Sequence, residues 1–275
     1  MPPSRRRLDA ELVRRKIARS REQAVEWIKA GRVEVGGFVA KKPATIVEPD
    51  VSIKVAHADE DDWASRGAHK LLGALEAFEP LGLSVDGKRA LDAGASTGGF
   101  TDVLLRRGAR EVVAVDVGYG QLVWRLQNDE RVTVLDRTNI RHLTRELMDG
   151  PADLMVGDLS FISLELVLPA IAECMSDGAD LLPMVKPQFE VGKDRLGSGG
   201  VVRSPELREE VTFDVARKSL ELGLSCKAAA ASPLPGPSGN VEYFLWLVRD
   251  GGASAPSDDE LVRMIHRAVE EGPEN

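Results

Sequence analysis

The chain has 275 residues, of which 43% are hydrophobic and 29% charged, and its formal net charge is −8 at pH 7. This composition and length are typical of a globular protein with one large domain and one small one. Its two cysteines lie far apart and outside any CxxC motif, so we expect neither a disulfide scaffold nor a metal site. The sequence offers no apolar run near the ~20 residues of a membrane-spanning helix and no apolar stretch of a signal peptide near its start. We therefore expect a cytoplasmic protein without membrane contact.

The charge is unevenly distributed along the chain. Residues 1–57 contain 13 Lys and Arg against 7 Asp and Glu, whereas the remainder contains 23 against 37. A small basic module suggests a polyanionic partner, although this charge alone is a weak indication. The module is predicted to contain a helix over 8–15, a helix ending at Gly31 with Ser20 and Gln23 as its capping box, and strands over 32–35 and 51–55.

Basic side chains of this module lie on the two helices and the turn between them, where they can meet phosphates. A solvated helical face explains these charges equally well. The order of residues, from Arg7-Leu8-Asp9 through Ser20-Arg21 and Gly31 to Lys42-Pro43, resembles the S-four-type RNA-binding domain, or αL motif. This resemblance implies binding to structured RNA through its shape and backbone. The predicted RNA-binding residues are Arg7, Arg14, Arg15, Arg19, Arg21, Lys29 and Lys42.

The remaining chain is divided into a linker at 58–66, an α/β domain at 67–250 and a C-terminal tail at 251–275. An apolar helical stripe runs from Ala68 to Phe78, flanked by Lys70. Strands and helices then alternate, which predicts a mainly parallel, seven-stranded, Rossmann-like sheet whose last strand is antiparallel and pairs at the sheet edge. The predicted strands are 89–93, 111–116, 132–135, 153–158, 180–185, 226–231 and 241–248, with helices at 99–107, 164–175 and 205–222.

A glycine-rich turn, "LDAGASTGGF", follows the first of these strands and lets a ligand approach the backbone. Asp116 ends the second strand and can accept hydrogen bonds from ribose hydroxyls. Because position 96 is Ser, the G-x-G-x-x-G fingerprint of an NAD enzyme is missing, and S-adenosylmethionine fits better. Asp136 is predicted beside the adenine edge, with a plain helix cap as its alternative. The predicted cofactor residues are Asp92, Gly94, Ala95, Ser96, Thr97, Gly98, Gly99, Phe100, Asp116, Val117, Asp136 and Asp158.

Charged residues stand where three strands meet the expected ligand edge of the sheet. Asp158 and Lys186 end their strands, and Glu242 stands where the last strand begins. Each alone is an ordinary strand end, and Lys186 by itself suggests only a solvated lysine. Together with Lys70 they form two cations and two anions, whose burial is costly unless they pair. A functional site at this edge explains such a cost.

The order Lys70, Asp158, Lys186, Glu242 resembles the Lys-Asp-Lys-Glu tetrad of FtsJ-like ribose 2′-O-methyltransferases. With the basic module, the chain resembles the TlyA family of rRNA methyltransferases through "SRGAHKL", "LDAGASTGGFTD", "DLSFISL", "VKPQFEVGK" and "GPSGNVEYF". The resemblance implies methylation of a cytidine ribose in 16S or 23S rRNA, or both, with S-adenosylmethionine as donor and ribosomal subunits as partners. A monomer is favoured. Some relatives are labelled haemolysins, and the tail after Asp250 matches nothing.

Under this resemblance Lys186 accepts the proton of the 2′-hydroxyl or, if charged, stabilises the forming alkoxide. Lys70 and Asp158 orient the hydroxyl and Lys186, and Glu242 pairs with a lysine. Three alternatives remain open at the level of sequence. They are a non-enzymatic RNA-binding protein with a ligand-free Rossmann-like domain, a membrane-active haemolysin and an NAD enzyme.

Overall fold

The computed structural model describes residues 5–55, 63–236 and 238–273, and part of the predicted linker lies outside these ranges. The chain forms two compact units, residues 1–62 and 63–275, and each is described by itself. None of the helices in the described ranges combines the length and the apolar character needed to cross a membrane.

The N-terminal unit has two helices, α1 (Leu8–Arg14) and α2 (Arg21–Lys29). The predicted N-cap is confirmed, because Ser20 Oγ accepts from Gln23 N at 3.2 Å. The Gln23 side chain does not complete the capping box and accepts instead from Arg19 N at 2.9 Å. Five short strands surround the helices, with antiparallel pairing in the orders β1–β4 and β3–β2–β5: β1 (Arg6–Arg7), β2 (Val33–Val35), β3 (Phe38–Val39), β4 (Ile46–Val47) and β5 (Ile53–Val55).

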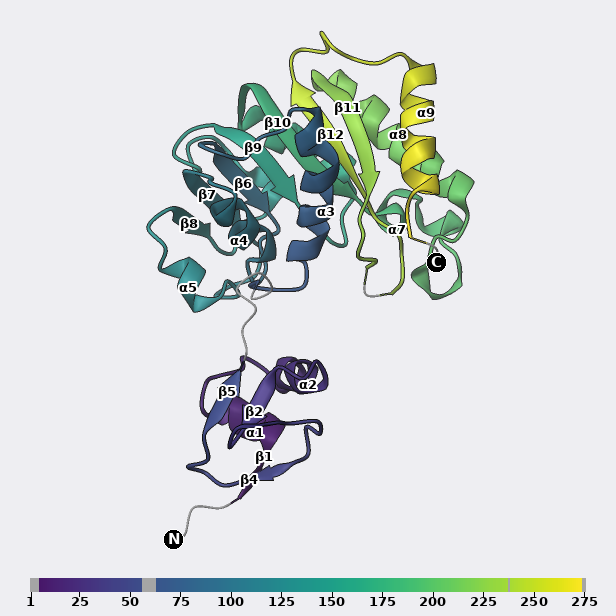
Figure 1. Cartoon of the computed structure of the whole chain (residues 1–275). Coiled ribbons are helices and arrows are strands. Elements are labelled where there is room, and N and C mark those ends of the chain that lie inside the picture. Colours follow the sequence, from purple (N-terminus) through teal and green to yellow (C-terminus); the bar gives the residue numbers. More distant parts are fainter. Residues whose placement is uncertain (1–4, 56–62, 237, 274–275) are drawn as a thin grey trace. The chain divides into compact units, whose positions relative to one another are not determined.

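The second unit contains a seven-stranded sheet in the order β11–β12–β10–β9–β6–β7–β8 (Figure 1). Five strands follow the predicted α/β alternation and pair in parallel, and β12 is antiparallel to both of its neighbours. The last strand is therefore antiparallel, as predicted, but it lies between β10 and β11, and β11 is the edge. The strands are β6 (Arg89–Ala93), β7 (Glu111–Val115), β8 (Val132–Leu135), β9 (Ala152–Gly157), β10 (Met175–Val185), β11 (Leu224–Ala231) and β12 (Tyr243–Arg249).

Helices cover both faces of this sheet, so its central strands are apolar on both sides. In β12, Phe244 and Trp246 pack with α3 (Ala68–Phe78) and α4 (Gly99–Arg106), whereas Tyr243, Leu245 and Leu247 face the opposite cluster. The period-2 alternation of a strand produces this division. The other helices are α5 (Trp124–Gln127), α6 (Leu168–Glu173), α7 (Pro187–Glu190), α8 (Pro205–Glu221) and α9 (Asp258–Glu270).

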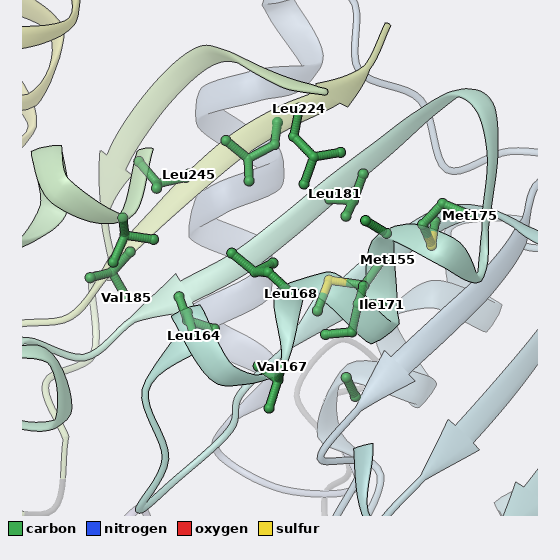
Figure 2. Close-up of a cluster of buried hydrophobic side chains, with 14 of the residues drawn as sticks. Met155, Leu164, Val167, Leu168, Ile171, Met175, Leu181, Val185, Leu224 and Leu245 are labelled. Carbon is green, nitrogen blue, oxygen red and sulfur yellow. The ribbon is translucent and has the colours of Figure 1, made fainter. Parts of the chain in front are cut away.

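The opposite cluster is drawn in Figure 2, which labels Leu168 and Ile171 of α6 and Leu181 and Val185 of β10 among its members. It also takes in α9, which lies in the C-terminal tail at 251–275, where no family motif matches. Ser257 and Glu260 form a complete capping box at its start, and the helix buries Leu261 and Ile265 among others. The C-terminal segment is thus part of the core of the second unit.

Candidate active site at the strand ends

Sheet topology brings the charged strand ends together. Parallel strands β9 and β10 end at one edge of the sheet, so Asp158 and Lys186 leave them side by side. Because β12 runs the other way, its first residue, Tyr243, pairs with Val185 at the end of β10. Glu242 therefore enters the same edge from the start of its strand, and Lys70 reaches it from the first turn of α3.

The four side chains form one continuous chain of ion pairs. Lys70 Nζ donates to Glu242 Oε2 at 2.6 Å and to Asp158 Oδ2 at 3.3 Å. The other oxygen of Asp158 lies 2.5 Å from Lys186 Nζ. Side-chain exposure is 8% for Lys70, 7% for Lys186 and 1% for Glu242, whereas that of Asp158 is 24%. The structure thus brings together all four residues that the sequence singled out.

Opposing effects act on the charge of Lys70. Burial disfavours its ammonium, but the carboxylates of Asp158 and Glu242 outweigh burial and raise the pKa of Lys70 above its ordinary value. Two cations and two anions leave the cluster neutral, which is the condition under which buried charges are tolerated. Lys70 is therefore a fixed positive charge, held between two anions.

Glu242 is placed by the turn that precedes β12. A Cβ added at Gly236 would lie 2.7 Å from Glu242 Oε1, so the carboxylate occupies the space that any side chain there would need. Asn240, which is 2% exposed, accepts from Val202 N at 2.9 Å and donates to Gly200 O at 2.9 Å. This amide ties the end of the glycine-rich loop after Lys186 to the same turn.

A pocket of about 500 Å³ opens beside the cluster at the ends of β6, β7 and β9. Gly94 adopts φ +86°, and a Cβ there would lie 3.0 Å from the carbonyl oxygen of Asp158, so a side chain at this position would press against the backbone at Asp158. Asp158 borders both pocket and ion pairs. The lining comprises the predicted Gly94, Ser96, Asp116, Val117 and Asp158, together with Val115, Gln121, Thr138, Asn139, Ile140, Leu159, Ser160, Phe161 and Ile162.

Asp116 and Asp136 are engaged with the loops around this pocket. Asp116 accepts from Ser96 N at 2.8 Å and from Gly118 N at 2.7 Å, so it shapes the glycine-rich turn. Asp136 accepts from Gly120 N at 2.8 Å and does not line the pocket. Its loop contact differs from both sequence interpretations, the adenine partner and the helix cap.

The other predicted cofactor residues do not line this pocket. Asp92 is fully buried, accepts from Thr101 Oγ1 at 2.6 Å and keeps one oxygen without a hydrogen-bond partner in the described structure. Burial raises the pKa of Asp92 to about 7. The residues outside the lining are Asp92, Ala95, Thr97, Gly98, Gly99, Phe100 and Asp136.

In the N-terminal unit, several predicted RNA-binding arginines pair with buried carboxylates. Asp9 accepts from Arg7 and Arg21, each at 2.9 Å, and Glu11 binds Arg14 at 2.6 Å. Arg15 binds Glu11 at 2.8 Å and donates to the carbonyls of Val51 and Pro49, each at 2.7 Å. Arg15 therefore links α1 to the segment before β5, whereas Lys29 and Lys42 are exposed.

A doubly wound sheet with one antiparallel strand, a glycine-rich turn after β6 and an acidic residue after β7 define a class I methyltransferase fold. The FtsJ-like methyltransferase model matches residues 63–249, and the S4 domain model matches residues 6–53. The chain belongs to the TlyA branch of the FtsJ-like methyltransferase family.

Two curated relatives and one solved structure support this placement. The chain is 59% identical to the 16S/23S rRNA (cytidine-2′-O)-methyltransferase TlyA of Mycobacterium tuberculosis, over 98% of this chain and 99% of that one. It is 35% identical to Hemolysin A of Brachyspira hyodysenteriae, over 86% and 98%. A Streptococcus thermophilus structure that carries a hemolysin name shares 34% identity, with a TM-score of 0.73 over 98% of this chain and 97% of that one.

Proposed function

We propose that this protein methylates the ribose 2′-hydroxyl of a cytidine in ribosomal RNA and uses S-adenosylmethionine as donor. The observation that carries the proposal is the buried chain Glu242–Lys70–Asp158–Lys186 beside the pocket of the glycine-rich turn. The name of the Mycobacterium tuberculosis relative supports the choice of cytidine and of both ribosomal subunits as substrates. The exposed cations of the S4 unit, such as Lys29 and Lys42, are proposed to bind the RNA backbone.

The residues present fit the cofactor. When bound, S-adenosylmethionine supplies a methyl group that its sulfonium already activates. Asp116 keeps further acceptor capacity on oxygens that each take one backbone N–H, and we assign it to the ribose hydroxyls. Gly94 and Ser96 line the pocket that would take the rest of the molecule, and Asp92, two residues before Gly94, keeps one oxygen without a partner in the described structure.

The enzyme's main task is to align a weak nucleophile, and alignment alone supplies up to ~7–11 kcal/mol in the best intramolecular reactions. In the step that we propose, ribose O2′ bonds to the methyl carbon while the carbon–sulfur bond breaks with its electrons on sulfur. Lys186, a cation in the resting cluster, first releases a proton to solvent, and the O2′ proton then passes to its neutral Nζ. Lys70 stays charged and stabilises negative charge near O2′, while Asp158 and Glu242 hold the two lysines in place.

We further propose that residues 1–57 bind RNA and that residues 67–250 transfer the methyl group. The protein is proposed to act in the cytoplasm as a monomer. The residues of the pocket and of the ion-pair chain all belong to the second unit. RNA docking by the first unit then raises the local concentration of the target nucleotide.

Substitution of the proposed proton acceptor tests this function. Lys186→Ala is expected to abolish rRNA methylation, read by mass spectrometry of rRNA digests, while calorimetry shows nearly unchanged binding of S-adenosylmethionine. Lys218→Ala is the matched control, because Lys218 pairs with Glu165 at the surface, 2.8 Å apart. Retained turnover in Lys186→Ala would contradict the proposed chemistry. Absence of cofactor binding by the unmodified protein would favour a non-enzymatic RNA-binding protein.

A further inference from the structure

The loops that carry Asp158 and Lys186 are joined again beyond the ion-pair chain. Lys186 Nζ donates to Ser160 Oγ at 2.8 Å. Four residues after Lys186, Glu190 accepts from Ser163 Oγ at 2.6 Å and from Leu164 N at 2.9 Å. The loop after β9 is therefore linked at two points to residues that follow β10, namely Lys186 and Glu190 of α7.

The Ser160 contact defines the direction in which Lys186 acts. Nζ donates a hydrogen bond to Ser160 and forms an ion pair with Asp158. No further partner of Nζ is found among the residues that the structure describes. The hydrogen bond to Ser160 fixes the direction of one N–H group, whereas the ion pair sets only the distance to the carboxylate. Without the hydroxyl of Ser160, Nζ would be free to rotate about the Cε–Nζ bond.

Ser160 itself is exposed, so its place depends on the path of its loop. Phe161, the next residue, adopts φ +63° and is 90% exposed, with its ring centroid 5.3 Å from that of Phe189. A non-glycine residue in the left-handed region persists only where its surroundings hold it. Glu190 fixes the loop two residues further on, because it accepts hydrogen bonds from Ser163 and Leu164.

Glu190 is suited to this role by its surroundings. Burial raises the pKa of Glu190 above its usual range, although its bonds to Ser163 and Leu164 act in the opposite direction. Burying a carboxylate costs free energy unless hydrogen bonds replace its lost hydration. Both of its oxygens are used on the one loop that carries Ser160.

We propose that Ser160 is a positioning residue that fixes the direction of Lys186 Nζ, and that Glu190 positions Ser160 in turn. This inference rests on the proposed function, because it takes Lys186 as the group that meets the ribose hydroxyl. Neither residue needs to touch the substrate. Their contribution lies in the alignment of the proton acceptor, where small displacements change the rate strongly.

Kinetics of Ser160→Ala and Ser160→Thr test the first part in the full-length protein. The alanine variant is expected to lose about tenfold in kcat, the effect of one hydrogen bond, with unchanged KM for ribosomal subunits and unchanged cofactor affinity. The threonine variant keeps the hydroxyl and is expected to regain most of the rate. If the alanine and threonine variants lose kcat to the same extent, the hydroxyl does not have the proposed role.

The second part is tested at Glu190. Glu190→Ala is expected to show the same loss in kcat with unchanged KM, and Glu190→Gln, which can still bond both partners, to restore part of it. Glu165→Ala is the control, because Glu165 lies in the same loop but binds only exposed Lys218 by its side chain. In a Ser160→Ala background, Glu190→Ala should cost less than alone, since its effect passes through Ser160. Full additivity would refute that link.

Lys186→Ala, assayed beside these variants, separates the two proposals. Wild-type kcat in both Ser160→Ala and Glu190→Ala, with an inactive Lys186→Ala, would overturn this inference alone. Turnover by Lys186→Ala would overturn the proposed function and the inference with it.

Discussion

The S4 unit and the strand-end cluster of the second unit both bury carboxylates, but they neutralise them with different cations. In the S4 unit, Asp9 and Glu11 are buried, whereas their arginine partners are about half exposed at Arg7, Arg14 and Arg21. Hydrogen bonds, first from Arg7 and then from Arg21, lower the pKa of Asp9 to about 2, and those from Arg14 and Arg15 do the same for Glu11. In the strand-end cluster of the second unit the cations are lysines, and they are buried with their partners. Elsewhere in that unit, buried Asp102 is paired with Arg106 and Arg125, as the carboxylates of the S4 unit are.

This difference separates anchoring from chemistry. Arginine keeps its proton in proteins, and its planar fork fixes a carboxylate in one geometry. Lysine is a point charge on a flexible stem that can take part in proton transfer when it is buried. The arginine pairs of the S4 unit therefore hold α1 in place. The lysine pairs at the strand ends fix the position of Lys186, the proposed proton acceptor.

Removal of the central cation of the catalytic unit is expected to have the largest effect. Lys70→Met leaves Asp158 and Glu242 without their shared ammonium, and breaking a buried pair in this way costs about 3–5 kcal/mol. Denaturant unfolding should show that loss, together with inactivity. Lys218→Met, at an exposed pair, should cost about 0–1 kcal/mol. Equal losses in the two variants would mean that burial does not distinguish the lysine pairs.

A pair of glycine substitutions in the turn before β12 sharpens the comparison between activity and stability. Gly236→Ala pushes on Glu242 Oε1, the mobile end of a side chain, so we expect a large loss of kcat with little loss of stability. Gly239→Ala meets no atom within 4 Å but has φ +90°, so it should cost about 1 kcal/mol of stability and keep the rate. Thermal unfolding and methylation assays of both variants would show whether this split occurs.

The smallest expected effect is acid sensitivity of the arginine pairs. The pKa values of Asp9 and Glu11 fall from 3.8 and 4.5 in the unfolded chain to about 2 on folding, so their stabilisation is fully present above the unfolded values. It is lost as the pH falls toward about 2. Amide hydrogen exchange in the full chain should show residues 5–55 losing protection across this window, and Glu11→Gln should flatten the dependence. An unchanged slope in that variant would exclude Glu11 as a source.

The strand-end residues were predictable because topology alone places them. Once β9 and β10 are parallel and β12 antiparallel, Asp158, Lys186 and Glu242 must share an edge. Side chains on loops carry no such signal, so the sequence did not single out Ser160, Gln121 and Glu190, and the adenine contact of Asp136 stays a prediction. Their positions depend on the tertiary path of each loop, which the sequence pattern does not encode.

The missed helix α9 is a different case, because its signal was present. Ser257 and Glu260 form a capping box in the printed sequence, followed by apolar residues at helical spacing. The prediction relied on family motifs, and these end before it. Likewise, the arginines of α1 were assigned to RNA from their charge and from the resemblance to the S-four-type domain, although buried Asp9 and Glu11 lie within a few residues of them.

The central position of β12 has a consequence for the time at which the enzyme becomes active. Strand β11 pairs with β12 alone, and Glu242 lies 172 residues along the chain from its partner Lys70. Contacts of such sequence separation form late, because a long loop must close first. A nascent chain therefore has no complete site until its last strand has emerged and entered the sheet between two earlier ones. Under the proposed mechanism, only a completely synthesised and folded chain can transfer a methyl group.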